Sequence, residues 1–212
     1  MKHRSVWLNG DSGEAVDAPS SIIKIEAPDV EENASHIKGS ENIISFYGDV
    51  NPITAGEISN LLTETDIRLQ NTKNLLGSDY TPTIHLKIRS DGGSLFEGLA
   101  ILDRMRSLKS KIHTYVEGGA ASAATLISVA GHKRYIGKNS LMLIHQLSAG
   151  NYGNFQQLEE QQENYRRLMQ IIKSVYKQYT KMPMKTLEDI LKKDLWLTAE
   201  ECLHYGMVDE IV

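Results

Sequence analysis

The sequence predicts an α/β fold with a largely parallel sheet and helices packed against it. The first observation is that strand patterns alternate with helical patterns from about residue 41 onward, an order typical of parallel sheets with crossover helices. The second is the length of 212 residues with 41% hydrophobic and 24% charged residues, which suits one substantial globular domain. The third is that no repeat or low-complexity tract interrupts this order.

Composition and charge exclude several classes of protein. The net charge is −4, so we expect neither nucleic acid nor a membrane as a partner. Cys202 is the single cysteine, which rules out an internal disulfide and suits a reducing compartment. No apolar run reaches the roughly 18–20 residues that span a bilayer, and the N-terminus lacks the apolar core of a secretory signal. We therefore expect a cytoplasmic protein.

Residues 1–40 are predicted to form an arm with little core of its own, and residues 41–212 to form the folded domain. The arm is polar and interrupted by glycines and prolines, although the alternating segment SIIKIEA at 21–27 has the pattern of a strand. Its composition leaves open whether the arm is removed as a propeptide.

The first half of the domain alternates strand, helix, strand and helix. A strand is expected at 43–50, followed by a helical period over 51–72 with Thr54 as the expected N-cap. TIHLKI at 83–88 predicts a second strand, which leads into a double glycine. The apolar residues of 95–109 then return to helical spacing.

The second half continues the alternation and contains one unusually polar helix. In order, the predicted elements are a strand at 111–117, a short apolar helix at 122–131, two strands within 132–145, a long helix at 153–180, a helix at 184–193, and a helix, turn and strand at 197–212. The long helix is rich in Gln and Glu, with sparse apolar positions. We expect it to project from the domain and to be covered there by a partner subunit.

Ser122 is the candidate nucleophile. It follows the small residues of 118–121 and precedes an apolar helix, so little shields its hydroxyl, and the amides that follow lie at a helix N-terminus that favours negative charge. A serine at such a position is more often a cap or a filler when taken alone. A catalytic role therefore requires a base, an acid and oxyanion donors elsewhere in the chain.

Two further segments have the residues that such chemistry needs. The double glycine of SDGGS at 90–94 lets backbone amides approach a ligand closely, although a turn is its commoner role, and phosphate-loop motifs are absent. His145 ends an apolar strand, where a buried and satisfied histidine is the more frequent explanation. The pattern alone does not choose an acid. Four aspartates are available: Asp91, Asp103, Asp189 and Asp194.

Four segments, taken together, resemble the family of Clp protease proteolytic subunits, ClpP. GGAASAATLISVAG is similar to the family's G-x-A-A-S-M-G motif and the apolar helix after it. NSLMLIHQ is similar to N-S-R-x-M-I-H-Q, SDGGSLFEGLAILDRMRS to the S-P-G-G segment, and KKDLWLTAEECLHYGMVDEIV to the C-terminal motif. The resemblance runs from about Ile43 to Val212 and leaves the first 40 residues outside.

The resemblance implies a serine endopeptidase that uses no metal and no cofactor. It assigns Ser122 as the nucleophile, His145 as the base and Asp194 as the acid that orients the base. It also places the oxyanion hole at the backbone amides of Gly93 and Ala123. The further substrate-binding positions that it implies are Gly92, Ser94 and Leu147.

The resemblance also implies an architecture and an assembly. The family fold is a crotonase/ClpP-like spiral of repeated β-β-α units with a projecting handle, which corresponds here to about 146–180. The subunits form stacked heptameric rings, so we expect a tetradecamer that encloses peptides or unfolded proteins. Contact between rings would then supply the partner that the polar helix requires.

Departures from the family pattern concern the cleft and the docking of an ATPase. Asp91 and Leu147 stand where the family has prolines, and Ala123 stands where it has methionine, so we expect an altered substrate preference. His85 and Lys87 stand where family members that bind an AAA+ ATPase carry aromatic residues. We expect such docking to be weakened or altered.

Three alternatives to an ATPase-assisted peptidase stay open. The first is a processing protease of viral or mobile-element type that cuts a specific protein without an unfoldase. The second is a non-catalytic ring subunit. The third is an acyl-CoA enzyme of crotonase fold, against which the Ser-His-Asp set counts because such enzymes do not need it.

Overall fold

The structure is a computed structural model that describes residues 37–150 and 152–212. The predicted strand at 21–27 lies outside the described residues. The described strands are β1 (Ile37–Ser40), β2 (Ile43–Tyr47), β3 (Thr83–Ser90), β4 (Lys111–Ala121), β5 (Lys133–Ile136), β6 (Leu141–Leu143), β7 (Trp196–Leu197) and β8 (Glu210–Ile211). The described helices are α1 (Pro52–Leu76), α2 (Leu95–Ser107), α3 (Ala123–Val129), α4 (Phe155–Tyr179), α5 (Met184–Leu191) and α6 (Ala199–His204).

The strands form one largely parallel sheet, which confirms the predicted α/β class. The order across the sheet is β1-β2-β3-β4-β5-β8, and β6 pairs with β4 while β7 pairs with β6. Among the strands of residues 37–150 and 152–212, only the β1–β2 and β6–β7 pairs are antiparallel. β4 is the central strand, because its first part pairs with β5 and its last part, from Gly119 to Ala121, pairs with β6.

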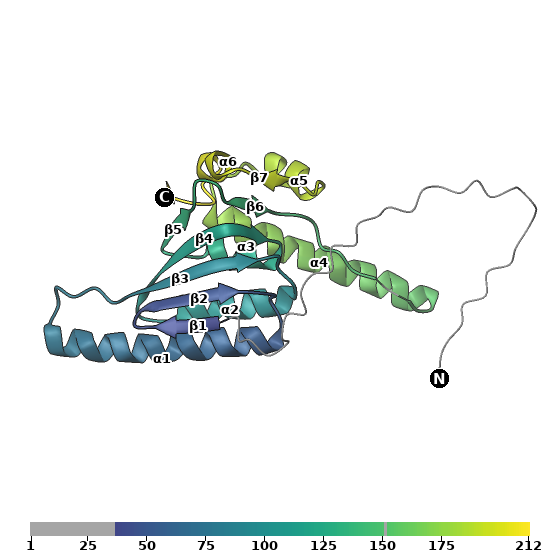
Figure 1. The fold of residues 1–212 in the computed structure, drawn as a ribbon. Helices are drawn as coiled ribbons and strands as arrows, with labels where there is room; N and C mark the ends of the chain where they lie inside the picture. The colour runs from purple at the N-terminus through teal and green to yellow at the C-terminus, as the bar shows by residue number, and fades with distance from the viewer. Residues whose placement is uncertain (1–36, 151) are drawn as a thin grey trace, which may run out of the picture. The chain divides into compact units, whose positions relative to one another are not determined.

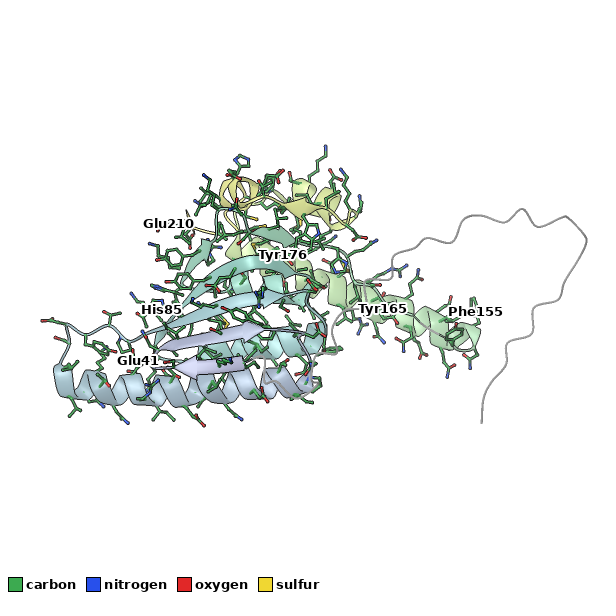
Figure 2. The ribbon with its side chains drawn as sticks, in the orientation of Figure 1. Glu41, His85, Phe155, Tyr165, Tyr176 and Glu210 are labelled. Atoms are coloured by element: carbon green, nitrogen blue, oxygen red, sulfur yellow. The ribbon has the colours of Figure 1, made fainter. Side chains whose placement is uncertain are left out.

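Strict alternation along β3 separates the two faces of the sheet. Ile84, Leu86 and Ile88 are fully buried, while His85 and Lys87 lie half-buried on the other face. Helices α1 to α4 cover the apolar face, each in contact with the next (Figure 1). The opposite face carries His85 (Figure 2), which contacts Tyr115, and Lys87, which pairs with Glu117.

Helix α1 begins one turn earlier than its expected cap implies. The N-cap is Asn51, whose side-chain oxygen accepts hydrogen bonds from the amides of Ile53 and Thr54, at 2.9 and 3.0 Å. The prediction of Thr54 as the cap is therefore wrong. Thr54 is the reciprocal partner, since its hydroxyl accepts a bond from the Asn51 amide, and Pro52 at the first helical position fits this geometry.

Helix α4 projects, as its composition predicts. Its buried residues are Ile172, Val175 and Tyr176, all near its C-terminal end, and its N-terminal part extends beyond the sheet (Figure 1). Apolar side chains such as Phe155 are exposed there. Across the part of the chain that the structure describes, no helix is long and apolar enough to cross a membrane.

Two short strands were not anticipated. β1 takes the last four residues of the predicted arm into the sheet, because Ile37 is buried and pairs opposite Phe46 of β2. β7 has only two residues and therefore shows no periodic pattern in the sequence. Its antiparallel pairing with β6 nevertheless positions the candidate active site.

Candidate active site

Ser122 lies on the turn between the end of β4 and the start of α3. Its backbone conformation is one that residues other than glycine rarely adopt. Its φ is 53° and its ψ is −125°, and such a conformation costs about 1–3 kcal/mol and persists only where the surrounding structure imposes it. Here the Ser122 amide donates to the carbonyl of Leu143 at 2.9 Å. The Ser122 side chain makes no capping bond to α3. A serine at such a position is ordinarily a helix cap or a filler, and the role of a side-chain cap is therefore excluded for Ser122.

The double glycine packs directly against this turn. Gly92 and Gly93 have φ values of 96° and 140°, in the region that favours glycine. A Cβ atom on Gly92 would lie 2.6 Å from the carbonyl oxygen of Ala121 and 2.7 Å from the Cβ of Ser122. A Cβ atom on Gly93 would overlap the carbonyl oxygen of Val50. Both positions therefore require glycine for close approach as well as for φ.

Strand register brings the other two predicted catalytic residues to the same place. In the parallel β4–β6 pair, Ala121 lies opposite Leu143, so Ser122 and His145 follow at adjacent strand ends. In the antiparallel β6–β7 pair, Leu143 lies opposite Trp196. Continued by two residues, forward along the chain from Leu143 and backward from Trp196, the same register places His145 opposite Asp194.

His145 and Asp194 interact at the position that this register sets. His145 Nδ1 lies 3.7 Å from Asp194 Oδ1, within ion-pair distance but longer than a hydrogen bond. The histidine side chain is 26% exposed and the aspartate side chain is 83% exposed. With Nδ1 directed at the carboxylate, the opposite nitrogen, Nε2, is available to the nucleophile. Catalytic contacts are often long in the absence of substrate.

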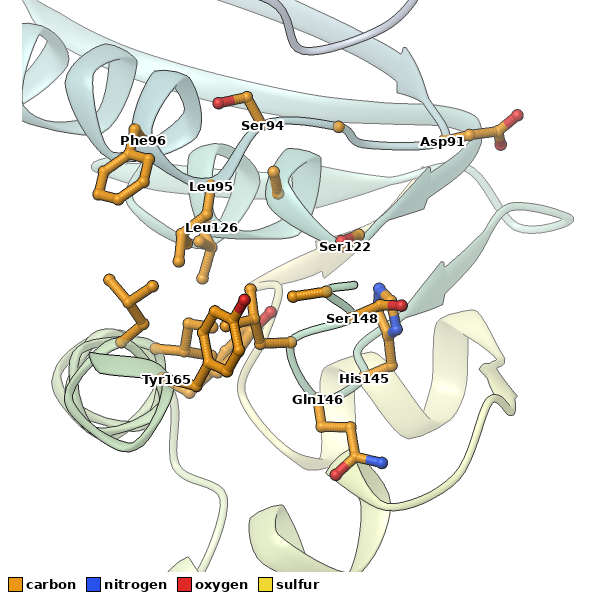
Figure 3. A pocket seen from close by; sticks show the side chains of 17 residues that line it. Asp91, Ser94, Leu95, Phe96, Ser122, Leu126, His145, Gln146, Ser148 and Tyr165 are labelled. Carbon is orange, nitrogen blue, oxygen red and sulfur yellow. The ribbon is translucent and has the colours of Figure 1, made fainter. Parts of the chain in front are cut away.

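A pocket of about 510 Å³ opens at Ser122 and His145 (Figure 3). Its polar end holds these two side chains and Gly93. Its other end is apolar and is formed by side chains of α2, α3 and α4 (Figure 3). The apolar lining residues are Leu95, Phe96, Ala123, Leu126, Leu147, Ala149, Tyr165, Leu168, Ile172 and Tyr176. The pocket can therefore receive an apolar side chain beside a polar reacting group.

Two backbone amides near Ser122 are available as donors. Ala123 is the first residue of α3, so its amide lies outside the hydrogen-bonding of the helix. The Gly93 amide has no hydrogen-bond acceptor among residues 37–150 and 152–212. Both residues line the pocket with Ser122. Amides in such positions stabilise an oxygen on which negative charge develops.

The pocket unites most of the predicted site residues. Ser122, His145, Gly93 and Ala123 line it, and so do two of the three predicted substrate-binding residues, Ser94 and Leu147. The third, Gly92, is buried against Ser122 and does not line the pocket.

Residues of α4 that line the pocket were missed as part of the site. Tyr165, Leu168 and Ile172 stood out in the sequence only as sparse apolar positions on a polar helix. These three side chains line a pocket within their own chain, and the expectation that a partner subunit covers the apolar positions of this helix stays a prediction. Leu158, nearer the projecting end, stays exposed and fits the expectation.

The described residues offer no site for a metal ion. In 37–150 and 152–212, no three His, Cys, Asp or Glu side chains gather closely enough to hold one. Cys202 is buried, and burial raises the pKa of its thiol to about 12. Cys202 is not among the residues that line the pocket, whereas the hydroxyl of Ser122 is.

Comparison with known proteins identifies the family. A family model described as Clp protease matches residues 72–212. The ATP-dependent Clp protease proteolytic subunit of Deinococcus radiodurans is 34% identical over 131 residues, which cover 61% of this chain and 64% of that protein. The protein of the same name from Streptococcus mutans is 39% identical over 139 residues, which cover 63% of this chain and 70% of that protein.

The matched region contains the whole candidate site, from the double glycine to Asp194. The match spans less than two thirds of the length of the Deinococcus relative. On the strength of the family model and the two relatives, the chain belongs to the Clp protease family.

Proposed function

We propose that the chain is a serine endopeptidase that hydrolyses peptide bonds in peptides and unfolded proteins, with Ser122, His145 and Asp194 as its catalytic triad. The observation that carries this proposal is the convergence of the three residues. Ser122 and His145 line one pocket, and Asp194 lies 3.7 Å from the imidazole. They come from three adjacent strand ends rather than from one sequence motif, which is typical of a triad.

The mechanism follows from these positions. His145 takes the proton of the Ser122 hydroxyl as the oxygen attacks the substrate carbonyl, and Asp194 stabilises the imidazolium that forms. The amides of Gly93 and Ala123 hold the oxyanion of the tetrahedral intermediate. His145 then donates the proton to the leaving amine, and water hydrolyses the acyl-enzyme by the same steps. The apolar end of the pocket positions a substrate side chain next to the scissile bond.

For the assembled protein, we propose a homo-oligomer of stacked heptameric rings in which α4 forms the contact between rings. Support comes from the exposed apolar residues at the projecting end of the described helix. Phe155 is 75% exposed and Leu158 is 42% exposed. The two residues are three positions apart and so lie on one face of the helix, and exposed apolar patches mark protein–protein interaction sites. Sedimentation or size-exclusion mass measures the assembly directly.

A processing protease that acts without an ATPase is the second candidate, because of the residues on the open face of β3. His85 Nδ1 lies 2.8 Å from the Tyr115 hydroxyl, and Lys87 Nζ lies 2.9 Å from Glu117 Oε1. Both side chains are thus engaged with neighbours where an apolar docking site would need exposed aromatic surface. Tight, loop-dependent capture of the chain by a AAA+ unfoldase would contradict this candidate.

Hydrolysis of a fluorogenic peptide and of an unfolded protein tests the proposed function. We expect Ser122→Ala to abolish hydrolysis and Asp194→Asn to lower kcat by up to about 10⁴-fold, because the imidazole loses its orienting charge. Asp189→Asn is the matched control, since Asp189 is an exposed carboxylate of α5 that pairs with Lys192 instead of His145. Equal effects of the two substitutions would contradict the assignment of Asp194.

The same assay separates the remaining alternatives. A non-catalytic ring subunit gives no hydrolysis by the wild type although the rings assemble. An acyl-CoA enzyme hydrolyses a thioester, and Ser122→Ala leaves that activity intact.

A further inference from the structure

Two buried hydroxyl groups form a relay behind the nucleophile. Thr125 Oγ1 donates to the carbonyl oxygen of Ser122 at 2.6 Å. Tyr176 Oη lies 2.6 Å from the same Thr125 oxygen. Thr125 is fully buried and Tyr176 is 2% exposed. The relay therefore connects α4, which carries Tyr176 (Figure 2), to the backbone of Ser122.

The direction of the relay follows from its protons. The Ser122 carbonyl only accepts, and the single hydroxyl proton of Thr125 is used in that bond. Tyr176 must therefore donate its phenolic proton to Thr125. Burial raises the pKa of Tyr176, which keeps that proton in place at neutral pH. The Ser122 carbonyl also accepts a bond from the Thr125 amide at 3.0 Å, so two donors of one residue hold it.

Holding this carbonyl also fixes the next amide. The C=O of Ser122 and the N–H of Ala123 belong to one planar peptide unit and point in opposite directions. Thr125 holds the Ser122 carbonyl along α3, so the Ala123 N–H points the other way, out of the N-terminal end of the helix beside Ser122, where both residues line the pocket. The left-handed φ of Ser122 requires support from its surroundings. The Thr125 hydroxyl adds to the two backbone bonds that Ser122 makes to Leu143 and Thr125.

We propose that Thr125 and Tyr176 are positioning residues that hold the Ala123 amide in the orientation that binds the oxyanion. This role rests on the proposed peptidase function and adds to it two residues that do not react with the substrate. Because Tyr176 belongs to α4, a shift of this helix, and so of the handle region, would change how well the Ala123 amide stabilises the transition state.

Steady-state hydrolysis of a fluorogenic peptide by Tyr176→Phe and Thr125→Val tests the role. An amide used only in the transition state affects kcat without affecting KM. Complete loss of one oxyanion donor typically costs about 10²–10³-fold in kcat. Because the relay orients the amide and does not supply it, we expect each variant to lose about 10-fold in kcat, with KM unchanged within about twofold. A peptide boronate should bind more weakly by a similar factor.

Two further variants exclude a merely structural effect. Thr125→Ser keeps the hydroxyl and should keep kcat within about threefold of the wild type. Ser128→Ala removes another buried hydroxyl of α3, one without a hydrogen-bond partner in the described part of the chain, and should leave kcat unchanged. Thermal melting of every variant is used to check that the assay temperature lies below the midpoint of unfolding of each.

Several outcomes would overturn the proposed positioning role of Thr125 and Tyr176. Wild-type kcat in both Tyr176→Phe and Thr125→Val overturns it, and so does an equal loss in Ser128→Ala or a change confined to KM. Absence of hydrolysis by the wild type is a different failure, because it refutes the proposed peptidase itself. Reaction of the wild type with a fluorophosphonate distinguishes the two failures.

Discussion

Replacing Gly92 by alanine tests whether the glycine loop and the nucleophile turn are packed as described. An added Cβ atom meets the Ala121 carbonyl oxygen at 2.6 Å and the Ser122 Cβ at 2.7 Å. Both contacts are backbone or short side-chain atoms that cannot rotate away. The φ of 96° is a second penalty for any residue with a side chain.

The strained φ and the steric overlap each lower the free energy of unfolding by an amount that can be estimated separately. A left-handed φ costs an L-residue about 1–2 kcal/mol, and overpacking of a filled core costs about 1–3 kcal/mol. We therefore expect Gly92→Ala to lower the free energy of unfolding by about 2–5 kcal/mol. Gly118→Ala is the matched control, because Gly118 has a φ of 81° while an added Cβ atom would meet only the Arg89 side chain, at 3.5 Å. Gly118→Ala should therefore lose only the first contribution.

Urea unfolding of both variants at one protein concentration measures the difference, and the rate of fluorophosphonate labelling reports on the site. We expect Gly92→Ala to be the less stable by about 1–3 kcal/mol and to react more slowly, since relief of the clash displaces Ser122. If Gly92→Ala is as stable and as reactive as Gly118→Ala, the described packing is refuted.

Three further predictions concern groups away from the pocket. The Asp66 carboxylate accepts a bond from the Ser110 amide at 2.7 Å. Asp66→Ala should therefore lower the unfolding free energy by about 1–3 kcal/mol in urea without changing peptide hydrolysis; an unchanged midpoint would contradict this. Burial acts to raise the pKa of Asp209, but hydrogen bonds and charge from Arg134 outweigh it and hold that pKa below its usual value. The wild type should thus lose stability as pH falls from about 4 through the depressed pKa. Urea midpoints between pH 5 and 2 should show less of this loss in Asp209→Asn, and an identical acid profile would argue against the pair. Because Cys202 is buried, with the pKa of its thiol raised to about 12, iodoacetamide should label it only after unfolding, and labelling of the native protein would be the contrary result.

Most of the fold could be predicted because each layer follows from a periodic pattern. The alternating apolar residues of β3 and the helical spacing of α2 give each element a single buried face. The long polar helix could be assigned for the same reason, since only its C-terminal end packs on the domain. The cap of α1 was displaced by three residues because Asn51 and Thr54 form a reciprocal pair, in which both residue types are good caps.

The site could be predicted only in part, because its assembly depends on pairing between distant segments. The acid could not be chosen among four aspartates by pattern, and Asp194 came from the family resemblance alone. Its position opposite His145 depends on β7, a strand too short to give a signal in the sequence. Thr125 and Tyr176 were missed for a similar reason, since a threonine in an apolar helix and a tyrosine in a polar one show no sign of their contact.

The most direct test of the central claim is the site of covalent modification by a fluorophosphonate. Reaction requires a serine hydroxyl that a base activates and an oxyanion site that accepts the phosphonyl oxygen. Intact mass should show one adduct per chain in the wild type, peptide mapping should place it on Ser122, and Ser122→Ala should take up none. Absence of reaction in the folded wild type, or an adduct on another serine, would contradict the assignment of Ser122 as the nucleophile.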